Sequence, residues 1–367
     1  MSRARREGET VATQLPATSA LSPTGPWPRQ ADIARIAGVS QATVSMVIND
    51  PGASRFSISA ATRERVWSAV EQLSYTTNSA ARVLAGGRSR TLGVFTFEPA
   101  FPTTAPDFYL PFLQGIEEES ERQDHDLLLF TSGSSPDRTR SIYRNGANRL
   151  RSTDGGIMLG LGGDVAELER LAGEPLPVVY VGRRVIPGVE VAYIGADYTG
   201  ATAQVVSLLM QAGHRQIAYL GRTDDDVPTR DRYRGYLAAH EAAGRQPPPG
   251  LHLPDDAAPA AMLRAILDSR ASAVIVQGST VATAIASAAQ TAGIQVPRDL
   301  SMAVLGDPPA DNERDWTGFD IPRSQMGENA VRMLVGMLDH PGGQLPQRLL
   351  TCTIHPGSTI APPPGEA

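Results

Sequence analysis

Apolar residues near the start of the chain recur at the spacing of short helices. Residues 31–49 read ADIARIAGVSQATVSMVIN, which predicts a helix over 31–36, a tight turn at Gly38 and a second helix opened by Ser40. Glycine reaches the positive φ that such a turn demands, and a serine hydroxyl accepts a backbone N–H of a first helical turn. One face of the second helix is expected to be buried, because apolar residues stand on it at i, i+3 and i+4, namely Val44, Val47 and Ile48.

A third amphipathic helix follows after a loop. Ser59 is placed to cap this helix, and its apolar residues again recur at helical spacing: Val66, Ala69, Val70 and Leu73. Three short helices whose apolar faces meet predict a small all-α domain.

From Thr91 onward the pattern changes to short apolar runs with the length of buried strands. These runs are TLGVFTF, DLLLFTS, GGIMLGLG, PVVYVG, VAYIG, QIAYLG, SAVIVQG and SMAVLG. Amphipathic segments such as 112–122, 200–212 and 232–243 lie between many of them. The alternation predicts parallel sheets covered by helices, and about 270 residues are too many for one such sheet, so we expect two α/β lobes.

The second helix presents short, uncharged residues opposite its apolar face: Gln41, Ala42, Ser45 and Met46. A helix with such a face suits a DNA major groove, where base edges are read. Any small helical hairpin can show the same pattern, so this face alone leaves both interpretations open.

Further motifs carry a resemblance to a known family. They are AGVS at 37–40, TVS at 43–45, TRERV at 62–66 and N-x-x-A-R-x-L at 78–84. In these motifs the chain resembles transcriptional regulators of the lac repressor family, and the resemblance continues through 195–221, 232–236 and 321–334. It implies an α/β fold class, in which an all-α N-terminal helix-turn-helix headpiece is joined by a hinge helix to a two-lobed, periplasmic-binding-protein-like effector domain.

The expected domains follow from this resemblance and from composition. Residues 1–28 are rich in Thr, Ser, Pro and Gly without periodicity, which predicts a disordered tail. Residues 29–76 form the headpiece, 77–90 the hinge helix and linker, and 91–361 the ligand-binding and dimerisation domain. The expected N-lobe comprises about 91–190 plus 322–350 and the C-lobe about 191–321 plus 351–361, with crossings near Val191, Pro322 and Thr351.

The resemblance implies which residues contact operator DNA. On the headpiece these are Ser40, Gln41, Ala42, Thr43, Ser45, Met46 and Asn49, and on the hinge they are Asn78, Ala81, Arg82 and Leu84. Met46 is a departure, because the family usually has an arginine there that grips guanine, whereas methionine offers an apolar contact. Leu84 is expected to enter the minor groove with the partner chain's leucine and kink the duplex. The alternative is that Leu84 packs against the body.

The resemblance also implies a ligand in the cleft between the lobes. The expected ligand-binding residues are Arg232, Phe108, Tyr109, Gly182, Gly278 and Asp307. Arg232 matches the family's arginine that forks onto effector hydroxyls or carboxylates, a surface ion pair being the alternative. Phe108 and Tyr109 are candidates to stack on a ring, although core packing is an equal alternative for Phe108.

This chain lacks several of the polar residues that sugar-binding members of the family usually carry. Gly182, Gly278 and Gly306 stand where such members carry polar side chains, and only Asp307 remains of one acidic pair. A common hexose is therefore not expected, because each unpaired buried polar group costs about 1–3 kcal/mol.

Composition and charge agree with this organisation. The chain has 367 residues, 41% of them hydrophobic and 20% charged, and no run approaches the ~18 apolar residues of a membrane span. No signal-peptide hydrophobic region opens the chain. The net charge is -6, yet residues 1–90 hold 11 arginines against 6 acidic residues, so the basic footprint is confined to this N-terminal part of the chain. The single cysteine, Cys352, suits a reducing cytoplasm, where a DNA-binding regulator is nucleoid-associated.

Enzyme motifs are missing from the sequence. The six histidines are scattered without H-E-x-x-H or another metal-ligand spacing. The glycines from Gly160 do not satisfy G-x-G-x-x-G, because Val165 stands at the last position, and neither G-x-S-x-G nor a P-loop occurs. We expect no catalytic residues, no cofactor and no metal, which disfavours an α/β enzyme with a DNA-binding appendage.

The sequence therefore predicts a DNA-binding transcriptional regulator, acting as a repressor. It is expected to bind a palindromic operator as a homodimer, with affinity modulated by a small-molecule effector such as a sugar or related metabolite. Two alternatives remain. One is a solute-binding protein of periplasmic type, which the headpiece and the missing signal sequence disfavour, and the other is a regulator that needs no effector.

Overall fold

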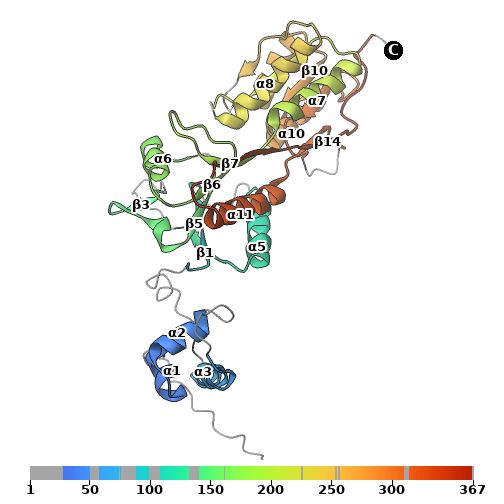
Figure 1. The fold of residues 1–367 in the computed structure, drawn as a ribbon. Coiled ribbons are helices and arrows are strands. Elements are labelled where there is room, and N and C mark those ends of the chain that lie inside the picture. The colour runs from blue at the N-terminus through green and yellow to red at the C-terminus, as the bar shows by residue number, and fades with distance from the viewer. Residues whose placement is uncertain are drawn as a thin grey trace, which may run out of the picture. The chain divides into compact units, whose positions relative to one another are not determined.

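The computed structural model describes residues 28–49, 58–73, 75, 88–98, 108–131, 140–160, 162–224, 226–252, 254, 257–309 and 314–365. The chain divides into two compact units, Met1–Gly87 and Arg88–Ala367 (Figure 1). Within the described ranges, no helix combines the length and the apolar character needed to cross a lipid bilayer.

The first unit, the headpiece, contains the helices α1 (Gln30–Ala37), α2 (Gln41–Asn49) and α3 (Ala60–Gln72). Gly38 ends α1 at φ +64°, and the Ser40 hydroxyl accepts the Thr43 backbone N–H at 3.1 Å. Ser59 caps α3, because its hydroxyl accepts the Thr62 backbone N–H at 3.2 Å. These contacts confirm the turn and both caps expected from the sequence.

The apolar faces of the three helices close into one small core. Its fully buried members include Ile33, Val44, Val47 and Val66, each 0% exposed. The other apolar residues that helical spacing predicts are buried or packed against this core: Ala69, Ile48, Val70 and Leu73.

The N-lobe of the second unit is a six-stranded parallel sheet with the order β13-β7-β6-β5-β1-β2. In that order the strands span Gln347–Leu350, Ala192–Ala196, Val178–Val181, Gly155–Leu159, Thr91–Thr96 and Asp126–Phe130. Helices α5 (Leu110–Arg122) and α11 (Arg323–Asp339) lie side by side on one face (Figure 1). The other face carries α6 (Val165–Ala172), the short helix η1 (Arg149–Ser152) and the hairpin β3 (Tyr143–Arg144) to β4 (Ala147–Asn148).

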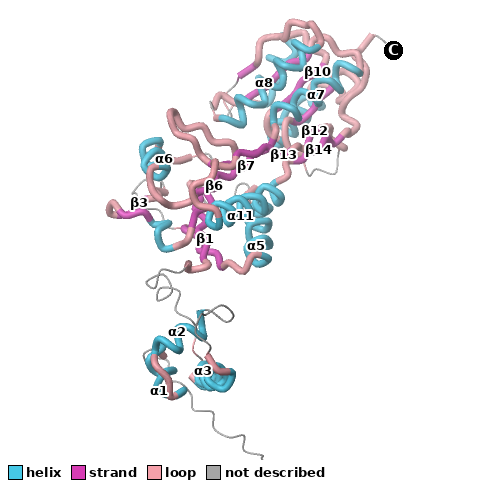
Figure 2. Tube along the Cα trace, viewed as in Figure 1, coloured by secondary structure: helices cyan, strands magenta, loops and turns pink. Residues whose placement is uncertain are grey.

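The C-lobe repeats this plan with a four-stranded parallel sheet of order β11-β10-β8-β9. Its strands span Ser301–Val304, Ala273–Val276, Ile217–Gly221 and Leu251–His252. Helices α7 (Tyr198–Gln211) and α8 (Val227–Ala242) pack on one face (Figure 2). Helices α9 (Pro259–Asp268) and α10 (Ser279–Thr291) pack on the other face. The short strands β12 (Gly318–Asp320) and β14 (Thr353–His355) pair antiparallel beside it.

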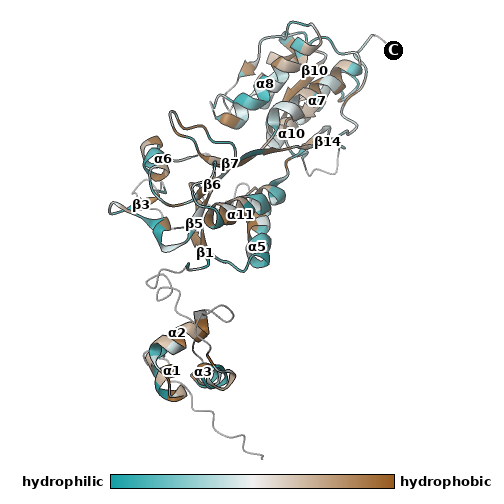
Figure 3. Ribbon diagram, in the orientation of Figure 1, coloured by the Kyte–Doolittle hydropathy of each residue, from teal (hydrophilic) through white to brown (hydrophobic). Residues whose placement is uncertain are grey.

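Both sheets are covered on both faces, which explains why their strands are continuous apolar runs. Along β1, Val94 packs toward α5 and α11 while the next residue, Phe95, packs toward α6. Figure 3 shows hydrophobic residues along the strands and hydrophilic residues on α5. This architecture confirms the α/β fold class with an all-α N-terminal unit.

One expected boundary between the lobes needs correction. β7 begins at Ala192 and pairs in parallel with β6 and β13, so it belongs to the N-lobe sheet. The first crossing therefore follows Ala196 rather than lying near Val191, because an apolar run does not reveal which sheet it joins. The other two crossings lie between β12 and α11 and between β13 and β14.

The segment that enters the N-lobe is fastened by carboxylates. The Ser89 backbone N–H and hydroxyl donate to Asp154 at 2.7 and 2.9 Å, and the Arg90 backbone N–H donates to the same carboxylate at 2.7 Å. Arg88 contacts Asp339 at 2.7 Å, at the end of α11. The start of the linker at 88–90 is thereby held against the lobe.

Glycines bring α5 and α11 into close contact. A Cβ added at Gly115 would overlap the Ser324 carbonyl oxygen, and one added at Gly327 would overlap the Phe112 carbonyl oxygen. The two backbones therefore touch at a distance that only glycine allows.

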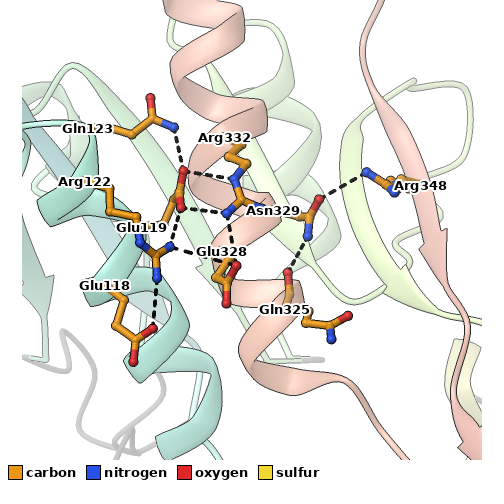
Figure 4. A network of polar contacts seen from close by, with 9 residues as sticks. All are labelled: Glu118, Glu119, Arg122, Gln123, Gln325, Glu328, Asn329, Arg332 and Arg348. Atoms are coloured by element: carbon orange, nitrogen blue, oxygen red, sulfur yellow. Dashed lines mark hydrogen bonds and ion pairs between the residues drawn. The ribbon is translucent and has the colours of Figure 1, made fainter.

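A buried carboxylate joins the same two helices further along (Figure 4). The Glu119 side chain on α5 is 5% exposed and accepts hydrogen bonds from Arg332 of α11 at 2.8 and 3.0 Å. It also accepts from Arg122 at 2.6 Å and from Gln123 at 2.8 Å. Burial would raise the pKa of Glu119, but the hydrogen bonds from Gln123, Arg332 and Arg122 outweigh it and hold the pKa below its ordinary value.

We expect Glu119→Gln to destabilise the N-lobe by roughly 2 kcal/mol, because it weakens several charge-assisted hydrogen bonds to a buried group. Since folding lowers the pKa of this carboxyl, its contribution is complete above the unfolded pKa of about 4.3 and is lost as the pH falls toward the lower folded value. Urea unfolding at several pH values between about 3 and 7 measures both the loss of stability and its dependence on pH.

The matched control for this substitution is Glu118→Gln. Glu118 is the preceding residue on α5, its side chain is 59% exposed, and it receives one hydrogen bond from Arg122. Its loss should change the free energy of unfolding by less than about 0.5 kcal/mol. Equal effects of the two substitutions would show that the burial of Glu119 does not matter.

Candidate functional site

The start of α2 is the first candidate surface. Gln41 and Ala42 are exposed there, while Ser45 and Met46 are half-buried on the same helix. The Thr43 hydroxyl lies 2.9 Å from that of Ser40, so both hydroxyls are tied together at the helix cap. Asn49 ends α2, but its side chain lies outside the described residues, as do the hinge residues Asn78, Ala81, Arg82 and Leu84.

The second candidate is a cavity of about 600 Å³ between the two lobes of the second unit. It lies at the carboxyl ends of strands from both sheets, since Val181, Leu159 and Leu305 line it. This is the usual ligand position in parallel α/β sheets. All the effector-binding residues expected from the sequence line this one cavity: Arg232, Phe108, Tyr109, Gly182, Gly278 and Asp307.

Arg232 is the most constrained of these side chains. It is 7% exposed, and its Nε donates to the Leu305 carbonyl at 2.7 Å while its Nη1 donates to the Pro228 carbonyl at 3.1 Å. Its guanidinium lies 3.9 Å from the centroid of the Tyr198 ring. The expected alternative of a surface ion pair is therefore wrong, because Arg232 is buried in the cavity wall.

The three glycines leave open space in this wall. A Cβ at Gly182 would meet no atom within 4 Å, and at Gly278 or Gly306 the nearest atoms would be 3.8 and 3.9 Å away. Gly182 and Gly278 also adopt φ of +103° and +108°, where other residues are strained. The polar side chains that the resemblance leads one to expect are thus replaced by room for a ligand.

The remaining predicted residues differ in how exposed they are and in how many contacts already engage them. Phe108 is 46% exposed, so it is not a core residue, whereas Tyr109 is 8% exposed. The Tyr109 hydroxyl donates to Glu98 at 2.8 Å, and burial followed by the charge of Glu98 raises the pKa of Tyr109. Asp307 accepts the Ile321 backbone N–H at 2.8 Å and pairs with Arg323.

Sequence reasoning did not single out Tyr198, Arg323 and Glu98, which line the cavity and contact predicted residues. Tyr198 and Arg323 lie in GADYTGA and IPRSQ, two segments that carry the family resemblance. Their position in these segments could have identified them as candidate ligand-binding residues. Glu98 ends an apolar run and has no comparable motif.

An ion pair joins the lobes beside the cavity. Arg183, next to Gly182 in the N-lobe, forms a two-pronged pair with Asp231 on α8, with its Nε 2.9 Å from Oδ2. Asp231 is 5% exposed and adjoins Arg232 in sequence. A change in lobe closure would alter this pair together with the cavity.

A cavity of about 670 Å³ also lies on the N-lobe, at the amino ends of β6 and β7. Its charged lining residues include Glu174 and Arg332. Glu174 pairs with Arg151, and Arg332 pairs with Glu119. The interlobe cavity is the better ligand site despite its smaller volume, because it lies at the carboxyl ends of strands from both sheets.

Comparisons with known proteins agree with this geometry. A family model described as bacterial regulatory proteins of the lacI family matches residues 31–78, and one described as a periplasmic binding protein-like domain matches residues 206–360. The chain is 30% identical over 312 residues to the HTH-type transcriptional regulator CelR of Thermobifida fusca, covering 83% of this chain and 89% of that protein.

Solved structures show the same fold. A complex of the transcriptional regulator CelR with cellobiose has a TM-score of 0.62 and 26% identity, covering 90% of this chain and 99% of the other. A lac repressor dimer bound to operator and the anti-inducer ONPF has a TM-score of 0.71 and 22% identity, covering 91% and 99%.

Proposed function

The chain belongs to the lacI family of bacterial regulatory proteins, and we propose from this premise that it binds an approximately palindromic operator as a homodimer under the control of a small-molecule effector. The comparisons confirm the family and the class of function expected from the sequence, which is a DNA-binding transcriptional regulator with an effector-binding domain. Such a protein acts where the chromosome lies, so we place it in the cytoplasm with the nucleoid.

The exposed start of α2 supports operator reading. Gln41 and Ala42 project from a helix whose opposite face is fixed in the headpiece core, so their position is defined when the helix enters a major groove. Two headpieces in a homodimer would read two half-sites related by the dimer axis. The bound dimer would then exclude polymerase sterically, which favours repression.

The interlobe cavity is the observation that carries the effector proposal. Its volume falls within the 300–1,000 Å³ that is typical, at order of magnitude, of small-molecule sites. Its wall is built from both lobes, so a bound ligand would favour a closed arrangement. Closure would reach the linker through the N-lobe and release the hinge from DNA, provided that the ligand binds the two states with different affinity.

Selection of genomic fragments by the purified protein, followed by footprinting at a defined salt concentration, tests this function. Salt must be stated because phosphate contacts make affinity strongly salt-dependent. We expect an enriched palindromic site whose neighbouring genes suggest effectors. Uniform capture of all fragments would contradict operator reading and leave the second unit as a ligand binder in its own right.

Met46 provides a specific test of the reading helix. We expect Met46→Arg to shift the preferred half-site toward guanine by about 1–3 kcal/mol, because arginine can donate two hydrogen bonds to guanine and methionine cannot. Met46→Leu keeps an apolar contact and should leave the preferred sequence unchanged. A selected binding-site logo that is the same for all three proteins would remove residue 46 from base reading.

A further inference from the structure

Arg232 is a buried cation in the wall of the interlobe cavity. Among the described residues, no carboxylate lies within ion-pair distance of its guanidinium, although the neighbouring Arg183, Arg222 and Arg323 each have one. Its guanidinium donates hydrogen bonds to the neutral carbonyls of Leu305 and Pro228. A buried charge is costly unless an opposite charge accompanies it, so this wall is prepared for an anion.

Two helices begin at the same wall. Helix α10 has Gly278 as its N-cap, and α11 has Pro322, and neither residue supplies a side-chain cap. Gly278, Ser279 and Arg323 all line the cavity. The amino end of α10 favours negative charge, while at the start of α11 the Asp307 carboxylate already accepts the Ile321 backbone N–H at 2.8 Å. The Nε of Arg323 is also buried without a hydrogen-bond partner among the described residues.

Two polar side chains that could bind sugar hydroxyls, Gln277 and Glu98, are already engaged within the protein. Gln277 donates to the Thr229 hydroxyl at 2.7 Å and accepts from the Tyr219 hydroxyl at 3.3 Å. Glu98 accepts from Tyr109 and from the Gly162 backbone N–H at 3.0 Å. A neutral sugar entering the cavity would lose water from several hydroxyls and find few free partners.

The N-lobe side of the cavity offers an apolar surface instead. Phe108 is 46% exposed and is held edge-to-face by Tyr109 and Phe112, with ring centroids 4.9 and 6.0 Å away. Leu159 and Val181 continue this surface. An exposed aromatic ring beside aliphatic side chains suits a flat, apolar ligand body.

The charges lining the cavity limit the ligand's own charge. The cationic residues are Arg222, Arg232 and Arg323, and the acidic residues are Glu98, Asp226 and Asp307. Arg222 already pairs with Asp224 and Arg323 with Asp307, so Arg232 can receive a single negative charge, whereas the three carboxylates would repel a dianion such as a phosphate monoester.

We infer that the effector is an organic monocarboxylate with an apolar, ring-sized body, its carboxylate on Arg232 and its body against Phe108, rather than a neutral sugar. This inference rests on the proposed function, because it names the ligand class of the same cavity. It sets the protein apart from the CelR structure, whose ligand is cellobiose.

Calorimetry on the full-length protein tests the inference with benzoate, phenylacetate and 3-phenylpropionate, each beside its uncharged primary amide, and with cellobiose. We expect at least one carboxylate to bind about tenfold or more tightly than its amide and than cellobiose, as a charge-assisted hydrogen bond predicts. A preference for cellobiose, equal binding of acids and amides, or binding of no carboxylate at millimolar concentration overturns the inference.

Variants locate the two parts of the ligand. Arg232→Gln should weaken binding of the carboxylate about tenfold and change binding of the amide little. Phe108→Ala should weaken binding of both probes alike and keep the ratio of their affinities. Should Arg232→Gln fail to fold, Arg232→Lys retains the charge and should retain part of the preference. The matched control is Arg264→Gln on α9, a side chain that is 84% exposed and should leave binding unchanged.

The same protein preparation is assayed for selective capture of genomic DNA, which separates the two proposals. Selective capture combined with a preference for cellobiose would overturn the ligand class while the regulator stands. A carboxylate preference without selective capture would support the ligand class and contradict operator reading.

Discussion

Arg232→Ala is expected to abolish ligand-induced release from the operator while the ligand-free protein binds the operator as before. The substitution removes a side chain that lies in the wall of the interlobe cavity, within the second unit, and that is anchored by Leu305 and Pro228. Ligand affinity should fall roughly 100-fold, the effect of losing about 3 kcal/mol of charge-assisted hydrogen bonding. The two carbonyls left behind adjoin the cavity, where water can satisfy them.

Operator release is measured by DNA-binding titrations with and without ligand, using whichever probe the wild type responds to. Arg264→Ala is the matched control, because Arg264 lies on α9 outside the cavity lining and its side chain is 84% exposed. This control should respond as the wild type does. If Arg232→Ala responded normally to the ligand, Arg232 would not belong to the binding site, and its charge would give no information about the ligand.

Gly327→Ala is expected to destabilise the N-lobe by about 3 kcal/mol, at the upper end of the usual cost of overpacking. The new Cβ would overlap the Phe112 carbonyl oxygen and lie 2.9 Å from the Ile116 nitrogen. Both are backbone atoms of α5, so no side-chain rotation relieves the overlap and the helices must separate. Separation would also lengthen the hydrogen bonds between Glu119 and Arg332, which depend on the same helix contact.

Gly336→Ala provides the comparison on the same helix. No atom lies within 4 Å of a Cβ built at Gly336, so the substitution should stabilise the protein by about 1 kcal/mol through the higher helix propensity of alanine. Urea unfolding followed by circular dichroism measures both variants. Stabilisation by both substitutions would show that α5 and α11 tolerate a wider separation than their glycine contact indicates.

Local patterns in the sequence were sufficient for the headpiece helices, the longer strands and the fold class, but not for the short strands β12, β13 and β14. The headpiece helices, the caps Ser40 and Ser59 and the strand runs depend on interactions within a few residues, so spacing and side-chain chemistry reveal them. The ligand-site prediction had a different basis. Arg232 and Asp307 were identified through the family resemblance, and the structure brings them to one cavity although their sequence separation carries no periodic signal.

Tertiary structure alone decided which sheet β7 joins, which carboxylate is buried and which buried cation has no carboxylate partner among the described residues. β7 has the composition of any buried strand, so only its pairing with β6 and β13 places it in the N-lobe. Glu118 and Glu119 are adjacent and chemically alike, yet only Glu119 meets Arg332 across the helix pair. Arg232 is unpaired because no carboxylate among the described residues folds against it. Each outcome depends on contacts between residues far apart in the chain, whereas the amino-acid pattern determines hydrogen bonding and burial only over neighbouring turns and strands.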